Sequence, residues 1–202
     1  MMVDEAKGNG RNRLLETVQA YGRERLEASG EAATIRRRHA EYYRALAEAA
    51  APEFTGPGQL TASARLEREH ANLRAALTWS LSAAAPIELG LRLAGALAWF
   101  WYTLGYLSEA RGWLDAVLTR GVAASAELQS WCLTMAGLFA WRQGDLATAR
   151  GRSEAARVLG QTLGQRSIVA WSLNTLGLIA MNEGDLSATQ ALLEESLTVF
   201  QS

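Results

Sequence analysis

The second half of the chain repeats itself at a spacing of about 40 residues. The segment WCLTMAGLFAWRQGDLATAR, which begins at Trp131, aligns with WSLNTLGLIAMNEGDLSATQ, which begins at Trp171. A weaker copy covers residues 91–118 at a shift of 39. The aligned glycines are Gly137 with Gly177, and Gly105 with Gly144 and Gly184. A fixed period of about 20 to 50 residues is typical of stacked structural units, so we expect a chain of similar elements.

Each repeat has the pattern of a helical hairpin. Two stretches of helical apolar spacing flank the tripeptide Gly-Asp-Leu, or Gly-Tyr-Leu in the first copy. The glycine can adopt the left-handed conformation that ends a helix, and Asp145 or Asp185 can then cap the next one. Gly137 and Gly177 lie inside the first helix, where a missing side chain lets two helices approach closely. Neither helix can bury its apolar side alone, so successive hairpins must stack.

Composition supports the helical interpretation. The chain has 202 residues, with 37 Ala and 30 Leu against 7 Val and 4 Ile, a set that favours helices over strands. Its three prolines all precede residue 87, so the strongest helix breaker is missing from the repeats. The sequence therefore predicts an all-α fold.

The repeat resembles a known family. The matching positions of the last copy are Leu173, Leu176, Gly177, Ala180, Gly184-Asp185-Leu186, Leu193 and Ser196, and their spacing is similar to that of the tetratricopeptide repeat (TPR). Thr189 stands where this family usually has alanine, Leu186 replaces tyrosine, and the first copy has Leu97-Ala98 in place of Leu-Gly. The resemblance implies a right-handed superhelical solenoid of three α-α hairpins over residues 87–202. The first helix of each hairpin would line its concave side.

The first half contains three further helical patterns. The first is carried by Leu14, Val18, Tyr21, Arg25 and Leu26, and the second by Ile35, His39, Tyr42, Tyr43, Leu46 and Ala49. Gly30 separates the two, and the loop PEFTGPG over residues 52–58 ends the second and is the best linker in the chain. A third helix is expected over residues 60–82, with a buried face made of Leu66, Leu73, Leu77 and Trp79.

Two strings of this first half carry a second, more specific resemblance. They are RNRLLETVQAYGRERLEASGEAATIRRRHAEYYRALAEAA and RLEREHANLRAALTWSL, and both are similar to the region after the nucleotide-binding module of bacterial LuxR-type and SARP-type regulators in the STAND (NB-ARC) ATPase class. The resemblance implies a winged-helix remnant with a helical adaptor in residues 1–58, a linking helix in 59–86 and the repeats in 87–202. We therefore expect a fragment of a larger transcriptional regulator, in which a strand near Leu14 has lost its sheet partners.

Several chemistries are excluded by the residues present. The only lysine, Lys7, does not follow a glycine-rich loop with P-loop spacing. Two histidines, His39 and His70, and one cysteine, Cys132, cannot supply a zinc site without several carboxylates. They are interpreted instead as helix-contact residues and a small buried thiol. No catalytic residue, metal or cofactor is predicted, and we expect a protein that is not an enzyme.

Charge and hydropathy restrict the partners. The net charge of −1 is not that of a nucleic-acid-binding domain, and the longest apolar stretch is too short to span a bilayer. The run Arg36-Arg37-Arg38-His39 has acidic neighbours and covers several helix faces, so it indicates a solvated surface or a contact with an ATPase core. With a lone cysteine and no leader segment, we expect a cytoplasmic bacterial protein without direct contact to nucleic acid or membrane.

The TPR resemblance assigns residues to the concave groove. They are Trp99, Tyr102, Trp131, Trp141, Arg142, Trp171, Asn174, Met181 and Asn182. A groove of this composition suits a protein or peptide, or a small apolar effector, because aromatic rings provide contact area and polar groups fix orientation. Two alternatives stay open: the tryptophans pack between hairpins instead, or the terminal hairpin pairs with a second copy to form a homodimer.

Overall fold

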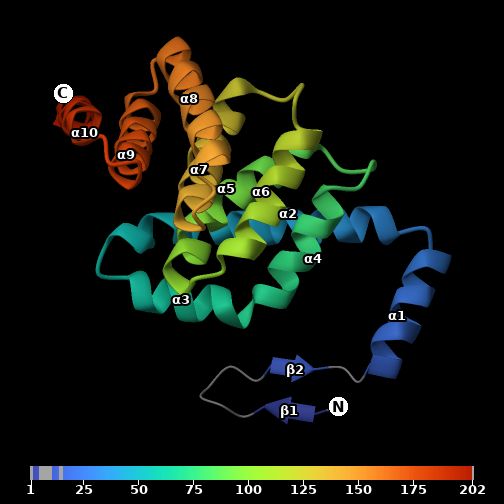
Figure 1. Cartoon of the computed structure of the whole chain (residues 1–202). Helices are drawn as coiled ribbons and strands as arrows, with labels where there is room; N and C mark the ends of the chain where they lie inside the picture. Colours follow the sequence, from blue (N-terminus) through green and yellow to red (C-terminus); the bar gives the residue numbers. More distant parts are fainter. Residues whose placement is uncertain (1, 5–10, 14–15, 202) are drawn as a thin grey trace. The chain divides into compact units, whose positions relative to one another are not determined.

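The computed structural model describes residues 2–4, 11–13 and 16–201 (Figure 1). The chain divides into two units, Met1–His39 and Ala40–Ser202. Apart from two strands of three residues each, the regular structure of the described residues is helical, so the predicted all-α class is confirmed.

The first unit begins with a small antiparallel ribbon. Strand β1 (Met2–Asp4) pairs with β2 (Arg11–Arg13), and helix α1 (Glu16–Ala28) follows. The predicted strand centre, Leu14, lies outside the described residues. The expectation that a strand here lacks a partner is wrong for β2, because β1 supplies the backbone hydrogen bonds locally. Gly30 separates α1 from the next helix at a φ of 75°, as predicted.

Helix α2 (Ala32–Ala50) buries only part of the predicted face. Ala40, Ala47 and Ala50 are fully buried, whereas Tyr42 is 62% exposed and Ala49 is exposed. Tyr43 and Leu46 of the predicted face are partly buried and pack against the core as well. Spacing alone favours the larger residues, and this is why the buried alanines were missed.

The predicted linker after α2 belongs to the core. Residues Ala51–Thr55 form the 3-10 helix η1, and its Phe54 is 5% exposed. The ring of Phe54 meets the ring of Phe100 edge-on, at 6.4 Å between centroids. Proline and glycine correctly mark the end of α2, but the buried phenylalanine fixes this segment against the repeats.

The single helix expected over residues 60–82 is broken in two. Helix α3 (Gln59–Arg68) ends at Glu69, whose φ of −98° and ψ of 6° leave helical geometry, and α4 (His70–Ser80) follows. The Glu69 carboxylate accepts hydrogen bonds from the Tyr43 hydroxyl at 2.9 Å and from Asn72 at 2.7 Å. A partner 26 residues away thus stabilises a break that helical periodicity does not encode. The predicted burial of Leu66, Leu73 and Leu77 is confirmed, and Trp79 is half-buried.

Three helical hairpins form the rest of the second unit. They are α5 (Ile87–Leu104) with α6 (Leu107–Arg120), α7 (Ala126–Arg142) with α8 (Leu146–Leu163), and α9 (Arg166–Asn182) with α10 (Leu186–Gln201). We call the first helix of each hairpin its A helix and the second its B helix. The A helices α5, α7 and α9 contact each other in sequence (Figure 1). The B helices α6 and α8 each pack between successive A helices, and α10 packs on α9.

The turns inside the hairpins use the residues that the repeat predicted. Gly105, Gly144 and Gly184 all have φ between 77° and 81°. The Asp145 carboxylate accepts a hydrogen bond from the Thr148 amide at 3.2 Å and thereby caps α8. Left-handed glycine followed by an acidic cap lets the chain reverse within three residues, which brings the B helix back along the A helix.

Candidate binding face on the A helices

Aromatic side chains form a continuous row along the A helices. The ring of Trp99 lies 5.4 Å from Tyr102, 6.3 Å from Trp131 and 5.3 Å from Trp171, measured between centroids. Trp171 in turn meets Phe200 of α10 at 5.7 Å. We call these five residues the aromatic row. The three tryptophans are half-buried, so their rings pack on each other and still reach the surface.

A glycine on α5 sets the position of Trp131. Its indole N–H donates a hydrogen bond to the Gly95 carbonyl oxygen at 2.9 Å. A Cβ at Gly95 would lie 3.0 Å from Cδ1 of the same indole, so a larger residue there would displace the ring. The indole therefore lies against the α5 backbone, and its polar group is already satisfied.

The remaining predicted groove residues fall into different surroundings. The Arg142 guanidinium lies over the Tyr102 ring at 5.2 Å from its centroid and so joins the aromatic row. The Trp141 indole N–H donates instead to the Asn182 side chain at 2.9 Å, a bond between neighbouring hairpins. Asn174 is half-buried and Met181 is 48% exposed.

The sequence reasoning missed Phe200 because it lies on a B helix. Groove positions were carried over from the A helices alone, and α10 is the B helix of the last hairpin. Helical spacing does not indicate that Phe200 contacts the A helices, because this residue lies on a side of α10 that is 48% exposed at Phe200. Only the packing of α10 on α9 brings it to Trp171.

A pocket of about 510 Å³ opens beside the aromatic row, between η1, the end of α2, α5 and α7. Two of its walls are the indoles of Trp99 and Trp131. Three charged residues line it as well: Glu48, Arg92 and Glu127. We call this the α5–α7 pocket. The sequence missed the two carboxylates, because Glu48 lies outside the repeats and Glu127 precedes the groove positions of α7.

The two carboxylates of the pocket differ in their partners. Glu48 accepts a hydrogen bond from Nε of Arg92 at 2.7 Å and also pairs with Arg44. Glu127 accepts a hydrogen bond from the neutral Ser125 hydroxyl at 2.5 Å, and it makes no ion pair within residues 16–201. One carboxylate therefore faces the pocket without a cationic partner.

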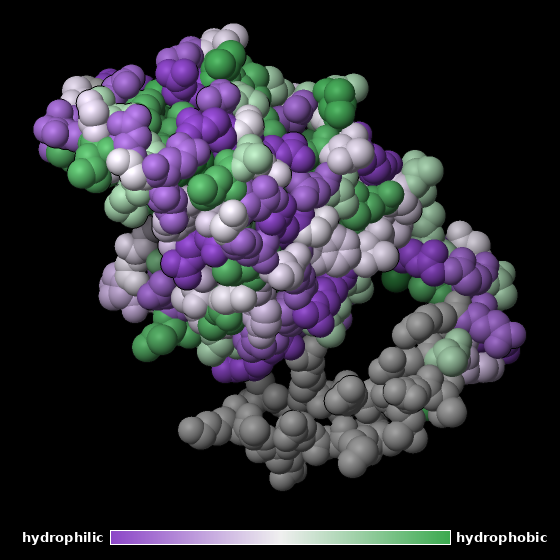
Figure 2. Space-filling view, in the orientation of Figure 1, coloured by the Kyte–Doolittle hydropathy of each residue, from purple (hydrophilic) through white to green (hydrophobic). Residues whose placement is uncertain are grey.

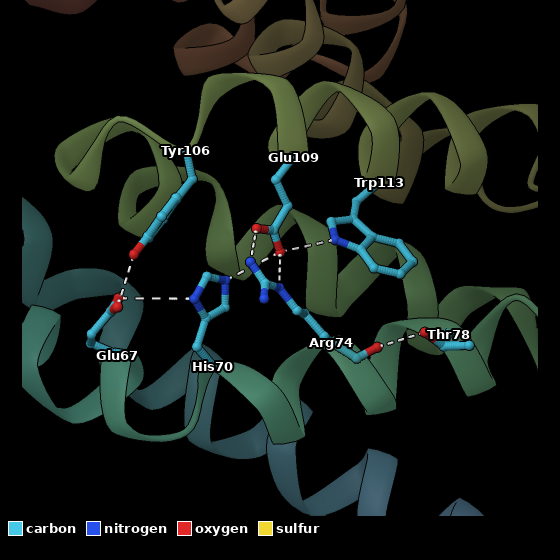
Figure 3. Close-up of polar contacts among 7 residues, drawn as sticks. All are labelled: Glu67, His70, Arg74, Thr78, Tyr106, Glu109 and Trp113. Carbon is cyan, nitrogen blue, oxygen red and sulfur yellow. Dashed lines mark hydrogen bonds and ion pairs between the residues drawn. The ribbon is translucent and has the colours of Figure 1, made fainter.

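A second polar cluster joins α4 to α6 (Figure 3). The Glu109 carboxylate accepts hydrogen bonds from Arg74 at 2.5 and 2.8 Å and from the Trp113 indole at 3.3 Å. Nε2 of His70 lies 3.1 Å from the same carboxylate. The interpretation of His70 as a helix-contact residue is confirmed: the ring is buried and meets the Phe100 ring edge-on at 5.3 Å.

The cluster shifts the ionisation of its members. The hydrogen bonds from Arg74 hold the pKa of Glu109 below its usual value. The Tyr106 hydroxyl donates to Glu67 at 2.8 Å, and this bond to an anion raises the pKa of Tyr106. Arginine, tyrosine and indole all act as donors to fixed carboxylates, so the arrangement fastens helices together and presents no activated nucleophile.

Cys132 matches its predicted role as a buried thiol. Its side chain is fully buried, the Sγ lies 3.3 Å from the Leu91 carbonyl oxygen, and burial raises the pKa of the thiol to about 12. Among residues 2–4, 11–13 and 16–201, no three His, Cys, Asp or Glu side chains come together as a metal site. None of the helices described is both long and apolar enough to cross a membrane.

The similarity to known proteins covers about two thirds of this chain. No protein-family profile matches it. Three curated relatives are each 34% identical to it over 149 residues, one from Mycobacterium bovis and two from strains of Mycobacterium tuberculosis. The chain is similar to one stretch of these longer proteins. The match covers 66% of this chain but 17% of each relative, and each relative bears the name "Putative HTH-type transcriptional regulator".

Proposed function

We propose that this chain is a non-catalytic interaction and signal-sensing domain of a bacterial transcriptional regulator. The similarity to relatives named as HTH-type transcriptional regulators supports the regulatory setting. The stacked hairpins with left-handed glycine turns support assignment to the TPR-like part of a LuxR-type or SARP-type STAND (NB-ARC) ATPase. In that setting the domain works in the cytoplasm and leaves DNA contact to another part of the regulator.

The observation that carries this proposal is the aromatic row. Five rings from α5, α7, α9 and α10 are joined by contacts, three of which are made by Trp99. Phe200 nevertheless keeps 48% of its surface exposed, and the tryptophans are half-buried. Packing between hairpins alone would bury such rings fully, as it does for Trp101 and Phe139. A row of partly exposed rings suits a protein or peptide segment, or a small apolar effector.

Selection from a displayed library of random peptides tests the proposal. Enriched peptides are titrated into the wild-type chain, into Trp171→Leu and into Trp79→Leu, a matched variant that removes a half-buried tryptophan of α4 outside the row. We expect Trp171→Leu to weaken binding by about tenfold, the effect of losing one aromatic anchor, and Trp79→Leu to leave it unchanged. If the peptides bound both variants with equal affinity, the aromatic row would not be the binding site.

A second candidate function rests on α10. Leu186 and Leu197 are 74% and 56% exposed, and Figure 2 shows hydrophobic residues at the surface near the C-terminal helices. Such a face could pair with a second copy and form a homodimer. Sedimentation velocity over a range of protein concentrations tests this, with Leu197→Ser expected to shift the chain toward monomer. A sedimentation coefficient that does not depend on concentration rejects it.

A further inference from the structure

We propose that the α5–α7 pocket binds a small organic cation with an apolar body. This inference rests on the proposed sensing function and names the chemical class of the effector. The observations that carry it are the two indole walls, the carboxylate without a cationic partner and the size of the pocket.

The indole walls favour a cation over an uncharged apolar body. The rings of Trp99 and Trp131 are tilted by 48° with centroids 6.3 Å apart, so together they form an open V. The N–H of Trp131 is already bonded to Gly95, which leaves its ring surface as the recognition element. The face of an indole is negative, and tryptophan is the aromatic side chain that attracts ammonium groups most strongly.

The charges of the pocket point the same way. Its lining carries the carboxylates of Glu48 and Glu127 and the guanidinium of Arg92, which is a formal charge of −1. Arg92 at 2.7 Å and Arg44 both pair with Glu48, so the charge of Glu48 is compensated. The carboxylate of Glu127 accepts only from the hydroxyl of Ser125 within the described helices. A bound ammonium would give Glu127 the counter-charge that an anion cannot supply.

The size of the pocket selects a small molecule. Its volume of about 510 Å³ is typical of sites for small ligands. The lining comes from α2, η1, α5 and α7. A quaternary ammonium that carries one ring or a short alkyl chain is of a size that such a space can hold.

Isothermal titration with benzyltrimethylammonium tests the proposal, with phenylmethanesulfonate as an anion of the same body. Glu127→Gln removes the charge at the pocket. Glu88→Gln is the matched control, because Glu88 is likewise an exposed acidic residue in the first turn of an A helix but does not line the pocket. We expect the cation to bind the wild-type chain more tightly than the sulfonate does. Glu127→Gln should weaken cation binding about fivefold and Glu88→Gln should not change it.

Three results would overturn the proposal: no detectable cation binding at millimolar concentrations, equal binding of cation and sulfonate, or equal loss in both variants. Tighter binding of N-acetyl-lysine methylamide than of benzyltrimethylammonium would also overturn it, in favour of a lysine side chain from a partner protein. Circular dichroism checks that both variants are folded. The peptide experiment on Trp171 reports on a residue outside this pocket, so failure of one experiment leaves the other able to succeed.

Discussion

Replacing Gly137 by alanine probes the closest approach of two helices in the repeats. A Cβ at this position of α7 would lie 2.6 Å from Oγ of Ser153 on α8 and 3.3 Å from the Ala149 carbonyl oxygen. The hydroxyl can rotate away, but the carbonyl oxygen belongs to the backbone of α8 and moves only with the helix. The substitution therefore forces a shift at the α7–α8 contact.

Opposing effects set the size of the change. Overpacking of a well-packed contact costs about 1–3 kcal/mol, and alanine is favoured over glycine inside a helix by about 1 kcal/mol. We therefore expect Gly137→Ala to lower the free energy of unfolding by up to about 2 kcal/mol, the difference between these two effects. Ser153→Ala removes the nearest atom, and its hydroxyl is buried with no hydrogen-bond partner in the described part of the chain. The double variant should regain part of this loss, as expected for residues in contact.

Urea unfolding followed by far-ultraviolet circular dichroism measures all four proteins of this cycle. The unfolding midpoints and slopes give the free energies, with equal slopes required for a direct comparison. A midpoint of Gly137→Ala above that of the wild type would show that the contact between α7 and α8 does not need the glycine. A loss that Ser153→Ala fails to reduce would show that the backbone contact, and not the hydroxyl, is the obstacle.

Three further predictions concern other contacts. Because bonds from Arg74 lower the pKa of Glu109, its stabilisation is complete above the unfolded-state value of about 4.3 and is lost as the pH falls through the lower folded-state pKa. Urea midpoints of Glu109→Gln and wild type should thus differ at pH 7 and converge in acid. Cys132, with a pKa of about 12, should react with Ellman's reagent at pH 8 only after unfolding. Ser196→Ala should cost about 1 kcal/mol, measured by urea unfolding, because its buried hydroxyl donates to the Ala170 carbonyl at 2.8 Å.

The repeat pattern was enough to predict the hairpins, because each signal in it is local. A left-handed glycine such as Gly144 and a capping aspartate such as Asp145 act within one turn, so the sequence carries them directly. The break at Glu69 and the burial of Phe54 depend on partners 26 and 46 positions away. No periodicity within a short window reports such distant contacts, and both were mispredicted.

The candidate site divides in the same way. Trp131 and Trp171 could be placed on one side of the molecule, because equivalent positions of stacked repeats point alike. Trp99 occupies another position of its A helix, which the TPR resemblance also assigns to the groove. The pocket beside them could not be predicted, because its other wall comes from Glu48 and Pro52, outside any repeat. A pocket between a repeat and a preceding element is set by how the two pack, which is a property of the folded unit.

A series of arginines shows where the stacking begins. The B helices α6 and α8 each carry an arginine as fifth residue, and so does α4. Each pairs with a carboxylate near the turn of the following hairpin: Arg74 with Glu109, Arg111 with Asp145, and Arg150 with Glu183, at 2.5, 2.8 and 2.5 Å. Partly exposed pairs of this kind contribute only about 0–1 kcal/mol each, so their common spacing matters more than their strength.

Because its fifth residue pairs with the following hairpin as in α6 and α8, α4 occupies the position of a B helix, although no glycine turn precedes it. Gln190 occupies the fifth position of α10 and donates to Glu194 of its own helix at 2.8 Å. The series of paired arginines therefore begins at α4, before the first hairpin, α5 with α6, in which the glycine turn occurs. The polar cluster of His70, Arg74 and Glu109 is then the first member of this series, and Glu109 is the most buried of the three carboxylates. The cluster joins α4 to the stack that carries the aromatic row.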